Sequence, residues 1–169
     1  MRFFLLDKFQ FFVKNGLNMD KIILQFLNTN NIFYQLLEHD PIFTMQQTTA
    51  IDGITLEEGM KSLLLKANNN YYLCVLPGHK KLDSKKLKQL LCTRDLRFAT
   101  AEEVKEIMKC EVGSCYPFGN LLPINMILEA SIGENRFVSF TPGVHNKSIK
   151  MRWKDYAKIV RPNIQHIAQ

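Results

Sequence analysis

The chain has 169 residues and a formal net charge of +6, and hydrophobic residues make up 46% of it against 22% charged residues. This composition is typical of a globular protein and excludes an intrinsically disordered chain. The sequence also contains no hydrophobic run near the roughly 18 residues of a membrane-spanning helix, so we expect no membrane partner. A chain of this length fits one domain, which would bury about 68–70% of the surface of its unfolded form.

The cysteines do not have the spacing of a metal site, because no histidine follows them at the distance typical of zinc ligands. Only two of the four lie close together in the sequence. We therefore expect reduced thiols in a cytoplasmic protein that uses no metal and no cofactor. The four are Cys74, Cys92, Cys110 and Cys115.

The first residues resemble a secretory signal peptide, but Asp7 and Lys8 interrupt the hydrophobic segment that such a peptide needs. A cleaner amphipathic helix begins at Met19. We therefore predict an N-terminal extension, residues 1–18, which is either an extra docking helix or a translated upstream stretch. Residues 19–169 are predicted to form a single domain.

The first half of this domain alternates helices and strands. Hydrophobic residues at helical spacing predict a first helix, and a strand follows after a turn rich in asparagine. Thr44 and Gln47 form a capping-box pattern, which predicts a short helix that ends at Gly53. Two strands joined by an asparagine-rich turn then indicate a hairpin. The predicted elements are the helices 19–28 and 44–53 and the strands 32–37, 60–66 and 71–76.

The second half continues the alternation. A helix that begins at Asp83 or Ser84 is predicted to bury Leu87, Leu90 and Leu91. Thr100 and Glu103 form a second capping box and open another helix, and a loop rich in glycine follows at 113–119. The remaining predictions are strands near 125–128, 136–140 and 148–151 and a last helix that ends at about Val160, before Pro162. This order implies an α/β (α+β mixed) fold with a mixed sheet flanked by helices.

Lys61 is the most informative residue of the hairpin. Side chains alternate along a strand, so Lys61 shares a face with Leu63 and Leu65 while Ser62 lies on the other face. A lysine directed towards a hydrophobic layer needs an anion or a function. The alternative is that Lys61 merely begins the strand and its side chain reaches water.

The loop 113–119 is a second informative feature. Its glycines allow the backbone N–H groups to approach a ligand closely, and Pro117 stiffens it. A lysine that faces such a loop would form, together with the loop amides, a binding site for a phosphate-bearing ester.

Positive charge is concentrated in two clusters. Residues 145–169 contain six lysines and arginines against one acid, Asp155, and a second cluster lies at 80–88. Such clusters are typical of a protein that binds a polyanion such as RNA, and the alternative is a solvated, lysine-rich surface.

Several motifs occur in an order that resembles a known family. The segment 38–44 contains a histidine, a proline and a threonine, and the segment 58–63 contains the strand with the lysine. The segment 75–83 is the turn after the hairpin, 113–119 is the loop with glycine and proline, and 140–146 closes the pocket. Together they resemble the YbaK/prolyl-tRNA-synthetase-associated domain, a family of aminoacyl-tRNA deacylases, from about Met19 to Val160.

The resemblance implies a barrel-like mixed β-sheet wrapped by helices. It also implies a trans-acting deacylase that hydrolyses the ester of mischarged tRNA in translation quality control. The implied partners are tRNA and an aminoacyl-tRNA synthetase, and the protein would be a monomer or a weak dimer. A non-catalytic tRNA- or synthetase-binding module of the same fold is the alternative.

The resemblance also implies roles for particular residues. Lys61 would hold the terminal adenosine by its phosphate or ribose, while the amides of Gly113 and Ser114 would stabilise charge on the ester carbonyl oxygen. A ribose hydroxyl of the substrate would act as base or relay. The implied substrate-binding residues are His39, Thr44, Ser62, Cys115, Pro117, Thr141 and His145.

Two positions depart from the alanine-editing members of the family. Those members have a histidine where Thr141 aligns and an asparagine where this chain has Ser62. The amino acid removed therefore stays open among alanine, cysteine, serine, threonine and others.

Five side chains have structural alternatives. Cys115 as a nucleophile would need a base that the sequence does not reveal, and His39 is more typical of a structural hydrogen-bonding residue. His145 is first a turn residue. Trp153 and Tyr156 are expected to pack in the core, unless an exposed ring stacks on RNA.

Overall fold

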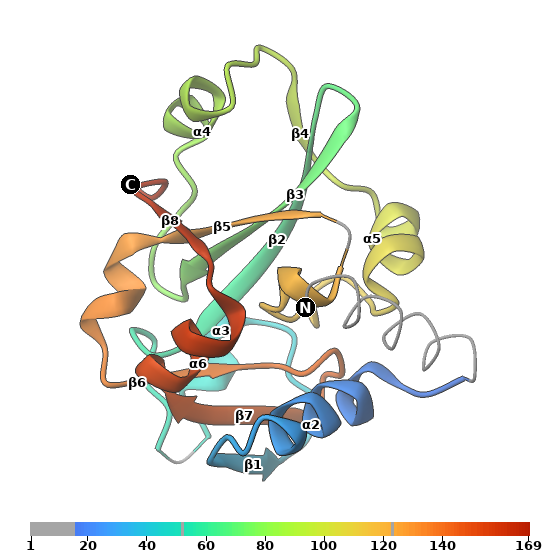
Figure 1. Ribbon diagram of the computed structural model, residues 1–169, viewed down its shortest axis with the longest axis vertical. Helices are drawn as coiled ribbons and strands as arrows, with labels where there is room; N and C mark the ends of the chain where they lie inside the picture. The colour runs from blue at the N-terminus through green and yellow to red at the C-terminus, as the bar shows by residue number, and fades with distance from the viewer. Residues whose placement is uncertain (1–15, 52, 123) are drawn as a thin grey trace.

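The computed structural model describes residues 16–51, 53–122 and 124–169, and it contains two β-sheets with helices around them (Figure 1). The predicted extension therefore lies largely outside the described residues. One sheet has three strands in the order β1-β7-β6, and the other has five in the order β4-β2-β3-β5-β8. The strands are β1 Tyr34–Glu38, β2 Met60–Ala67, β3 Asn70–Pro77, β4 Leu96–Phe98, β5 Asn125–Glu129, β6 Phe137–Phe140, β7 Lys147–Arg152 and β8 Asn163–Gln165.

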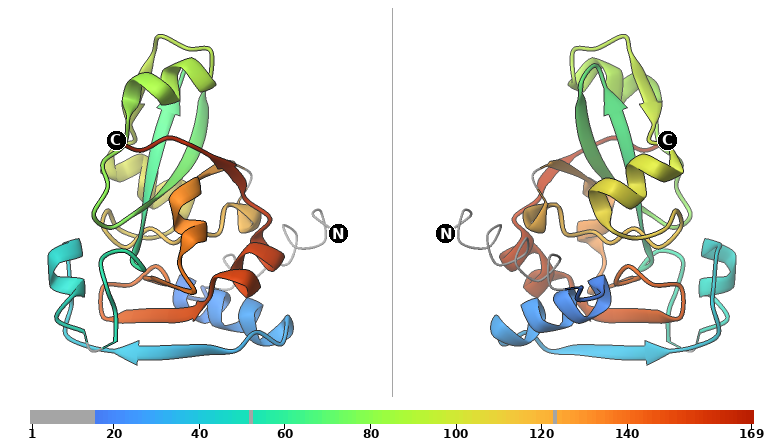
Figure 2. Two further views of the ribbon diagram at one scale, coloured as in Figure 1. Left: turned by 90° about the vertical axis from the view of Figure 1, so that its left-hand side faces the viewer. Right: turned by 90° about the vertical axis from the view of Figure 1, so that its right-hand side faces the viewer.

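The helices lie around these sheets, and the two side views show the three-stranded sheet at one end of the molecule and the β2–β3 hairpin rising towards the other (Figure 2). They are α2 Met19–Thr29, α3 Met45–Thr48, α4 Ser84–Leu90, α5 Ala101–Met108 and α6 Trp153–Val160, with short 3₁₀ helices η1 Gly119–Leu121 and η2 Ala130–Glu134. The described helices all fall short of the length and hydrophobicity that a bilayer-crossing segment requires.

The predicted mixed α/β architecture is confirmed. The three-stranded sheet is antiparallel, whereas the five-stranded sheet is mixed: β2–β3 and β2–β4 are antiparallel pairs and β3–β5 and β5–β8 are parallel pairs. The described strands do not close into one barrel. Among the described residues, one isolated β-bridge joins the two sheets, between Gly59 and Ser139, and the amide of Ser139 also donates to the carbonyl of Glu58 at 2.8 Å.

The hairpin β2–β3 separates two hydrophobic cores, because alternate side chains leave a strand on opposite faces. Leu64, Leu73 and Val75 enter the main core, while Leu65 and Cys74 enter a smaller second core. The predicted alternation along β2 is therefore confirmed, with hydrophobic packing on both faces.

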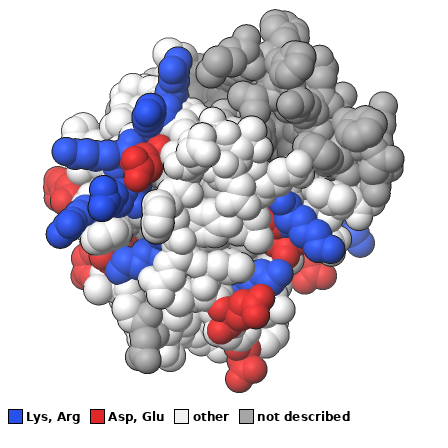
Figure 3. All heavy atoms as spheres, turned by 60° about the horizontal axis from the view of Figure 1, so that its bottom comes forward, with Lys and Arg blue, Asp and Glu red and all other residues white. Residues whose placement is uncertain are grey.

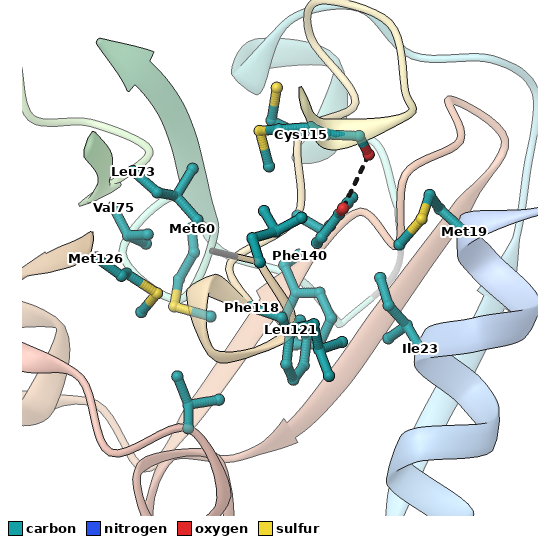
Figure 4. Close-up of a cluster of buried hydrophobic side chains, with 14 of the residues drawn as sticks. Met19, Ile23, Met60, Leu73, Val75, Cys115, Phe118, Leu121, Met126 and Phe140 are labelled. Atoms are coloured by element: carbon teal, nitrogen blue, oxygen red, sulfur yellow. Dashed lines mark hydrogen bonds between the residues drawn. The ribbon is translucent and has the colours of Figure 1, made fainter. Parts of the chain in front are cut away.

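The main core joins α2 to both sheets. Phe118 lies at its centre, in edge-to-face contact with Phe26 and Phe140 at ring-centroid distances of 5.9 and 5.2 Å. Figure 4 shows Phe118 between Met60, which belongs to β2, and Ile23, which belongs to α2. These contacts hold the strands that surround the cavity described below.

Both predicted capping boxes are present. Thr44 accepts from the amide of Gln47 at the start of α3, and Thr100 accepts from the amide of Glu103 at the start of α5. The predicted burial along α4 is wrong for one residue: Leu90 is 40% exposed, because only Leu87 of this short helix points into the second core.

Two strands were not predicted. β4 and β8 have three residues each and pair with β2 and β5. The chain beyond β8 is fixed by Glu129, whose carboxylate accepts from the amides of Ile167 and Ala168 at 2.7 and 2.8 Å. Burial raises the pKa of Glu129, but the hydrogen bonds from these amides and from Ser131 outweigh it, so its net pKa lies below the ordinary value.

Candidate functional site at the junction of the two sheets

A cavity of about 380 Å³ lies where the two sheets meet. This volume is within the range of small-ligand sites, roughly 300–1,000 Å³. Its walls come from the start of β2, the end of β6, the beginning of β7, helix α3 and the loop after α5. Among the lining residues are Lys61, Gly113 and His145, which are far apart in the sequence.

Lys61 lines the cavity and is half-buried. Its ammonium group donates to the carbonyl of Gly78 at 3.1 Å, and none of the ion pairs among the described residues involves it. Burial, followed by the positive charge of Lys81, lowers the pKa of Lys61. The folded protein therefore holds a lysine whose charge lacks a carboxylate partner in the described chain, beside a cavity that an anion could enter.

Gly113 lies in the opposite wall with φ +90°, a backbone conformation that glycine adopts readily. No hydrogen bond from its amide occurs among the described residues. A Cβ atom at this position would lie 3.2 Å from Cε1 of His145. The backbone here is thus closely packed against that imidazole ring.

Ser114 does not line the cavity, although it was predicted to present its amide to the substrate. Ser114 is 1% exposed and is not among the cavity-lining residues. Its amide donates to the carbonyl of Glu111 at 3.1 Å, and its hydroxyl donates to the same carbonyl at 2.9 Å. Because a turn already uses this amide, the geometry argues against Ser114 as a donor to the substrate.

Pro117 also lies away from the cavity. It is buried, and its carbonyl accepts from the hydroxyl of Tyr156 at 2.6 Å. Pro117 therefore stiffens the loop from behind and is not placed to contact a ligand. Tyr156 is fully buried and Trp153 packs on the same core, which agrees with the structural interpretation of both rings.

His145 is the titratable side chain that packs against Gly113. Its Nδ1 lies 2.9 Å from the carbonyl of Ile42, and since a carbonyl only accepts, Nδ1 carries a proton. Nε2 lies 3.7 Å from the carboxylate of Glu111, which is 82% exposed. The ring also contacts Phe43 at a centroid distance of 4.5 Å. In the neutral form, Nε2 offers a lone pair beside the cavity.

His39 acts through a neighbour. Its Nδ1 lies 2.8 Å from the carbonyl of Asp40 and its Nε2 lies 2.9 Å from the hydroxyl of Ser148, which lines the cavity. His39 itself is not among the lining residues. The structural interpretation of this histidine is therefore favoured: it orients Ser148.

The remaining predicted residues line the cavity: Thr44, Ser62, Cys115 and Thr141. The hydroxyl of Thr141 donates to the carbonyl of Val144 at 2.5 Å, which fixes the closing turn. The only side-chain hydrogen bond to Cys115 among the described residues comes from the thiol of Cys110, so no base is placed to activate Cys115 as a nucleophile.

Comparisons with known proteins identify the fold around this cavity. Residues 39–159 match the model of the aminoacyl-tRNA editing domain. The chain belongs to this family. It is 26% identical to the prolyl-tRNA editing protein ProX of Acetoanaerobium sticklandii over 143 residues, which cover 81% of this chain and 87% of ProX.

Two further similarities agree with this assignment. The multifunctional Ser/Thr-tRNA deacylase ProXp-y of Escherichia coli strain K12 is 22% identical over 148 residues, covering 84% of this chain and 88% of the deacylase. A crystal structure described as that of a candidate trans-editing enzyme for prolyl tRNA synthetase superposes with a TM-score of 0.78 at 20% identity, covering 89% of this chain and 97% of the other. The predicted family and fold are thereby confirmed.

Sequence reasoning missed part of the wall of this editing domain. Ser139 and Ser148 line the cavity from the three-stranded sheet, and Phe43, Phe98 and Val112 line it while remaining 63%, 59% and 59% exposed. These three form an exposed hydrophobic rim at the cavity. In the sequence each of these three is a large hydrophobic residue next to at least one polar or charged residue, and this pattern is too common to identify a site.

Proposed function

We propose that this editing domain is a trans-acting aminoacyl-tRNA deacylase that hydrolyses the ester of mischarged tRNA. The observation that carries the proposal is one cavity lined by a lysine, a glycine and an imidazole ring, in which neither the lysine has a carboxylate partner nor the glycine amide an acceptor among the described residues. The editing enzymes to which the chain is similar support the reaction type.

The reaction is the attack of water on the carbonyl carbon of an activated ester. Negative charge develops on the carbonyl oxygen, and the Gly113 amide would stabilise it; one such hydrogen bond contributes about 2.7–4 kcal/mol to the transition state. Lys61 would bind the phosphate or ribose of the terminal adenosine and so fix the ester. Nε2 of His145 would accept a hydrogen bond from the water or from a ribose hydroxyl, which acts as relay.

Selection of the substrate would depend on the walls around the ester. A synthetase discriminates one methylene by only about 1–3 kcal/mol, so a separate editing site must remove the errors. Thr44, Ser62 and Thr141 line the cavity and would bound the space for the amino-acid side chain, while His39 would act by orienting Ser148. Cys115 would belong to the same wall.

The substrate implies a cytoplasmic enzyme that contacts tRNA and, as a further proposal, a synthetase. Figure 3 shows lysines and arginines on both sides of an uncharged centre, with the larger group at the left and acidic residues among them. Two lysines of the C-terminal cluster are already neutralised: Lys147 lies 2.6 Å from Asp20 and Lys150 lies 2.7 Å from Glu58. The exposed cations left for tRNA in this cluster are Arg152, Lys154, Lys158 and Arg161.

The test is release of amino acid from a panel of tRNAs mischarged with alanine, cysteine, serine or threonine. We expect one or more to be hydrolysed, and Lys61→Met to lower kcat/KM by about 100-fold or more, as for the removal of other groups that stabilise charge in a transition state. Because the folded state lowers the pKa of Lys61, this change should not lower the free energy of unfolding at neutral pH. Full activity of Lys61→Met would refute the role of the lysine.

A matched control lies on the same strand. Lys66 points to the opposite face of β2 and pairs with Glu103 at 3.7 Å, outside the cavity. Lys66→Met should keep the deacylase activity. Binding of tRNA without hydrolysis of any member of the panel would instead support the alternative, a binding module of the same fold.

A further inference from the structure

Two buried thiols meet at the wall of the cavity. Sγ of Cys110 lies 4.0 Å from Sγ of Cys115, and each residue is 7% exposed. Cys110 follows helix α5, and Cys115 lines the cavity two residues after Gly113. The pair is therefore built into the loop that would position the ester.

We propose that Cys110 and Cys115 form a redox pair, which a peroxide oxidises to a disulfide and which thereby switches off the deacylase. The regulatory part rests on the proposed function, and the redox pair itself does not. The cavity gives a small oxidant access to Cys115 without exposure of the thiol on the outer surface.

The environment separates the roles of the two sulfurs. The hydrogen bond from Cys110 lowers the pKa of the Cys115 thiol despite its burial, whereas the same interaction and burial raise the pKa of Cys110. Cys115 also lines the cavity, so it is the sulfur that an oxidant reaches first, and the thiolate is the form that reacts with peroxides. Cys110 is not among the cavity-lining residues, so it acts in the second step.

The chemistry balances with hydrogen peroxide as the oxidant. The Cys115 thiolate attacks one peroxide oxygen, the O–O bond breaks, and hydroxide leaves and takes up a proton as water, which gives a sulfenic acid. The Cys110 sulfur then attacks the sulfenic sulfur, the S–O bond breaks, and a second water leaves. Two thiols and one peroxide yield one disulfide and two waters, and a dithiol reductant reverses the change.

Disulfide formation would move the loop. A sulfur–sulfur bond is about 2.05 Å long, so the two sulfurs must approach by about 2 Å from their present separation. The segment between them carries Gly113, whose amide would bind the ester oxygen. Since misplacement of a catalytic group by about 1 Å can cost about 100-fold in rate, we expect oxidation to lower kcat/KM by that order.

The experiment treats the folded full chain with hydrogen peroxide and maps disulfides by mass spectrometry, then assays the deacylase before and after dithiothreitol. We expect a Cys110–Cys115 disulfide and a loss of activity that dithiothreitol restores. Cys110→Ser should keep the activity of the reduced protein and should form no disulfide at Cys115 after peroxide treatment. Cys74→Ser and Cys92→Ser are matched controls, because these thiols lie outside the cavity lining and should leave the response intact.

Two results would overturn the inference. The first is an oxidised protein in which Cys110 and Cys115 remain unlinked. The second is a mapped disulfide that leaves an active deacylase unchanged. A chain that forms the disulfide but hydrolyses no aminoacyl-tRNA in either state would contradict the proposed function while supporting the redox pair.

Discussion

At the scale of single residues, the exposed rings beside the cavity are the least expected feature. Phe43 and Phe98 are more than half exposed although both line a binding site. Exposed aromatic rings bind unpaired nucleotides by stacking, which contributes about 1–3 kcal/mol per base. The single-stranded end of a tRNA would reach these rings when its terminal ester lies at Gly113.

Phe98→Ala is therefore expected to weaken binding of a CCA trinucleotide by about 5- to 150-fold, which corresponds to the loss of one stacked base. Phe33→Ala is the matched control, since Phe33 is 90% exposed and does not line the cavity. Isothermal titration of the trinucleotide compares the two. Equal affinities for both variants would contradict a stacking role for Phe98.

Some of the site was predictable residue by residue. Alternation along β2 placed Lys61 on the face of Leu65, because the strand period is a fixed geometric property: Leu76, the register partner of Lys61, belongs to the same second core as Leu65. The role of the Ser114 amide was not predictable in the same way. Sequence identifies a loop that can present amides, but the carbonyl of Glu111 occupies this one, and such a turn hydrogen bond is visible only in three dimensions.

At the scale of elements, helix α5 shows how a local motif is reinforced by distant residues. Glu103 closes the capping box by accepting from the amide of Thr100 at 2.8 Å. It also accepts two hydrogen bonds from Arg97 at 2.7 Å and one from Tyr71 at 2.6 Å. The hydrogen bonds from Arg97, first, and from Tyr71 hold the pKa of Glu103 far below its usual range.

Thr100→Ala should lower the free energy of unfolding by about 0.5–2 kcal/mol, the usual cost of removing a helix cap. Urea denaturation measures it, with Ser84→Ala as control at an exposed helix start whose side chain has no described hydrogen bond. Because the pKa of Glu103 is depressed in the folded state, its contribution is present above its ordinary value of 4.5 and is lost as the pH falls. A Thr100→Ala protein as stable as Ser84→Ala would contradict the cap.

Elements with a strong local signal were predictable, and short ones were not. The capping boxes and the hydrophobic face of α2 specify where their helices begin, but α3 ends at Thr48 and not at the predicted Gly53. By contrast, β4 and β8 have three residues each, and their pairing with β2 and β5 depends on the rest of the fold. Three residues are too few for a periodic pattern to be recognised.

At the scale of the whole molecule, exposed positive charge attracts a polyanion such as tRNA. The exposed lysines Lys154 and Lys158 lie one helical turn apart on α6, and neither has an ion-pair partner among the described residues. Lysines that bind phosphates release counterions, so tRNA affinity should fall steeply with salt.

Replacing both Lys154 and Lys158 by alanine should weaken tRNA binding and reduce the slope of log affinity against log salt by about 1 for each phosphate that the variant no longer binds. Filter binding of uncharged tRNA over a salt series measures the slope. Phe98→Ala is the control, since the removal of a neutral ring leaves the slope unchanged. A slope that the double variant does not alter would exclude α6 from the tRNA surface.

The class of fold was predictable from the order of helices and strands, but the division into two sheets was not. A strand pattern does not reveal which edges pair, and here a bridge between Gly59 and Ser139 connects the sheets. The cavity could not be predicted without this contact between the sheets, because each sheet supplies part of its lining.

The junction at Gly59 and Ser139 has a consequence for assembly. The recess forms only after segments far apart in the sequence have come together, since β2 contributes one side and β6 and β7, nearly eighty positions later, contribute the other. A nascent chain that ends after the β2–β3 hairpin lacks β6 and β7, so its cavity is not yet enclosed. Ligand recognition therefore begins late, with completion of the second layer.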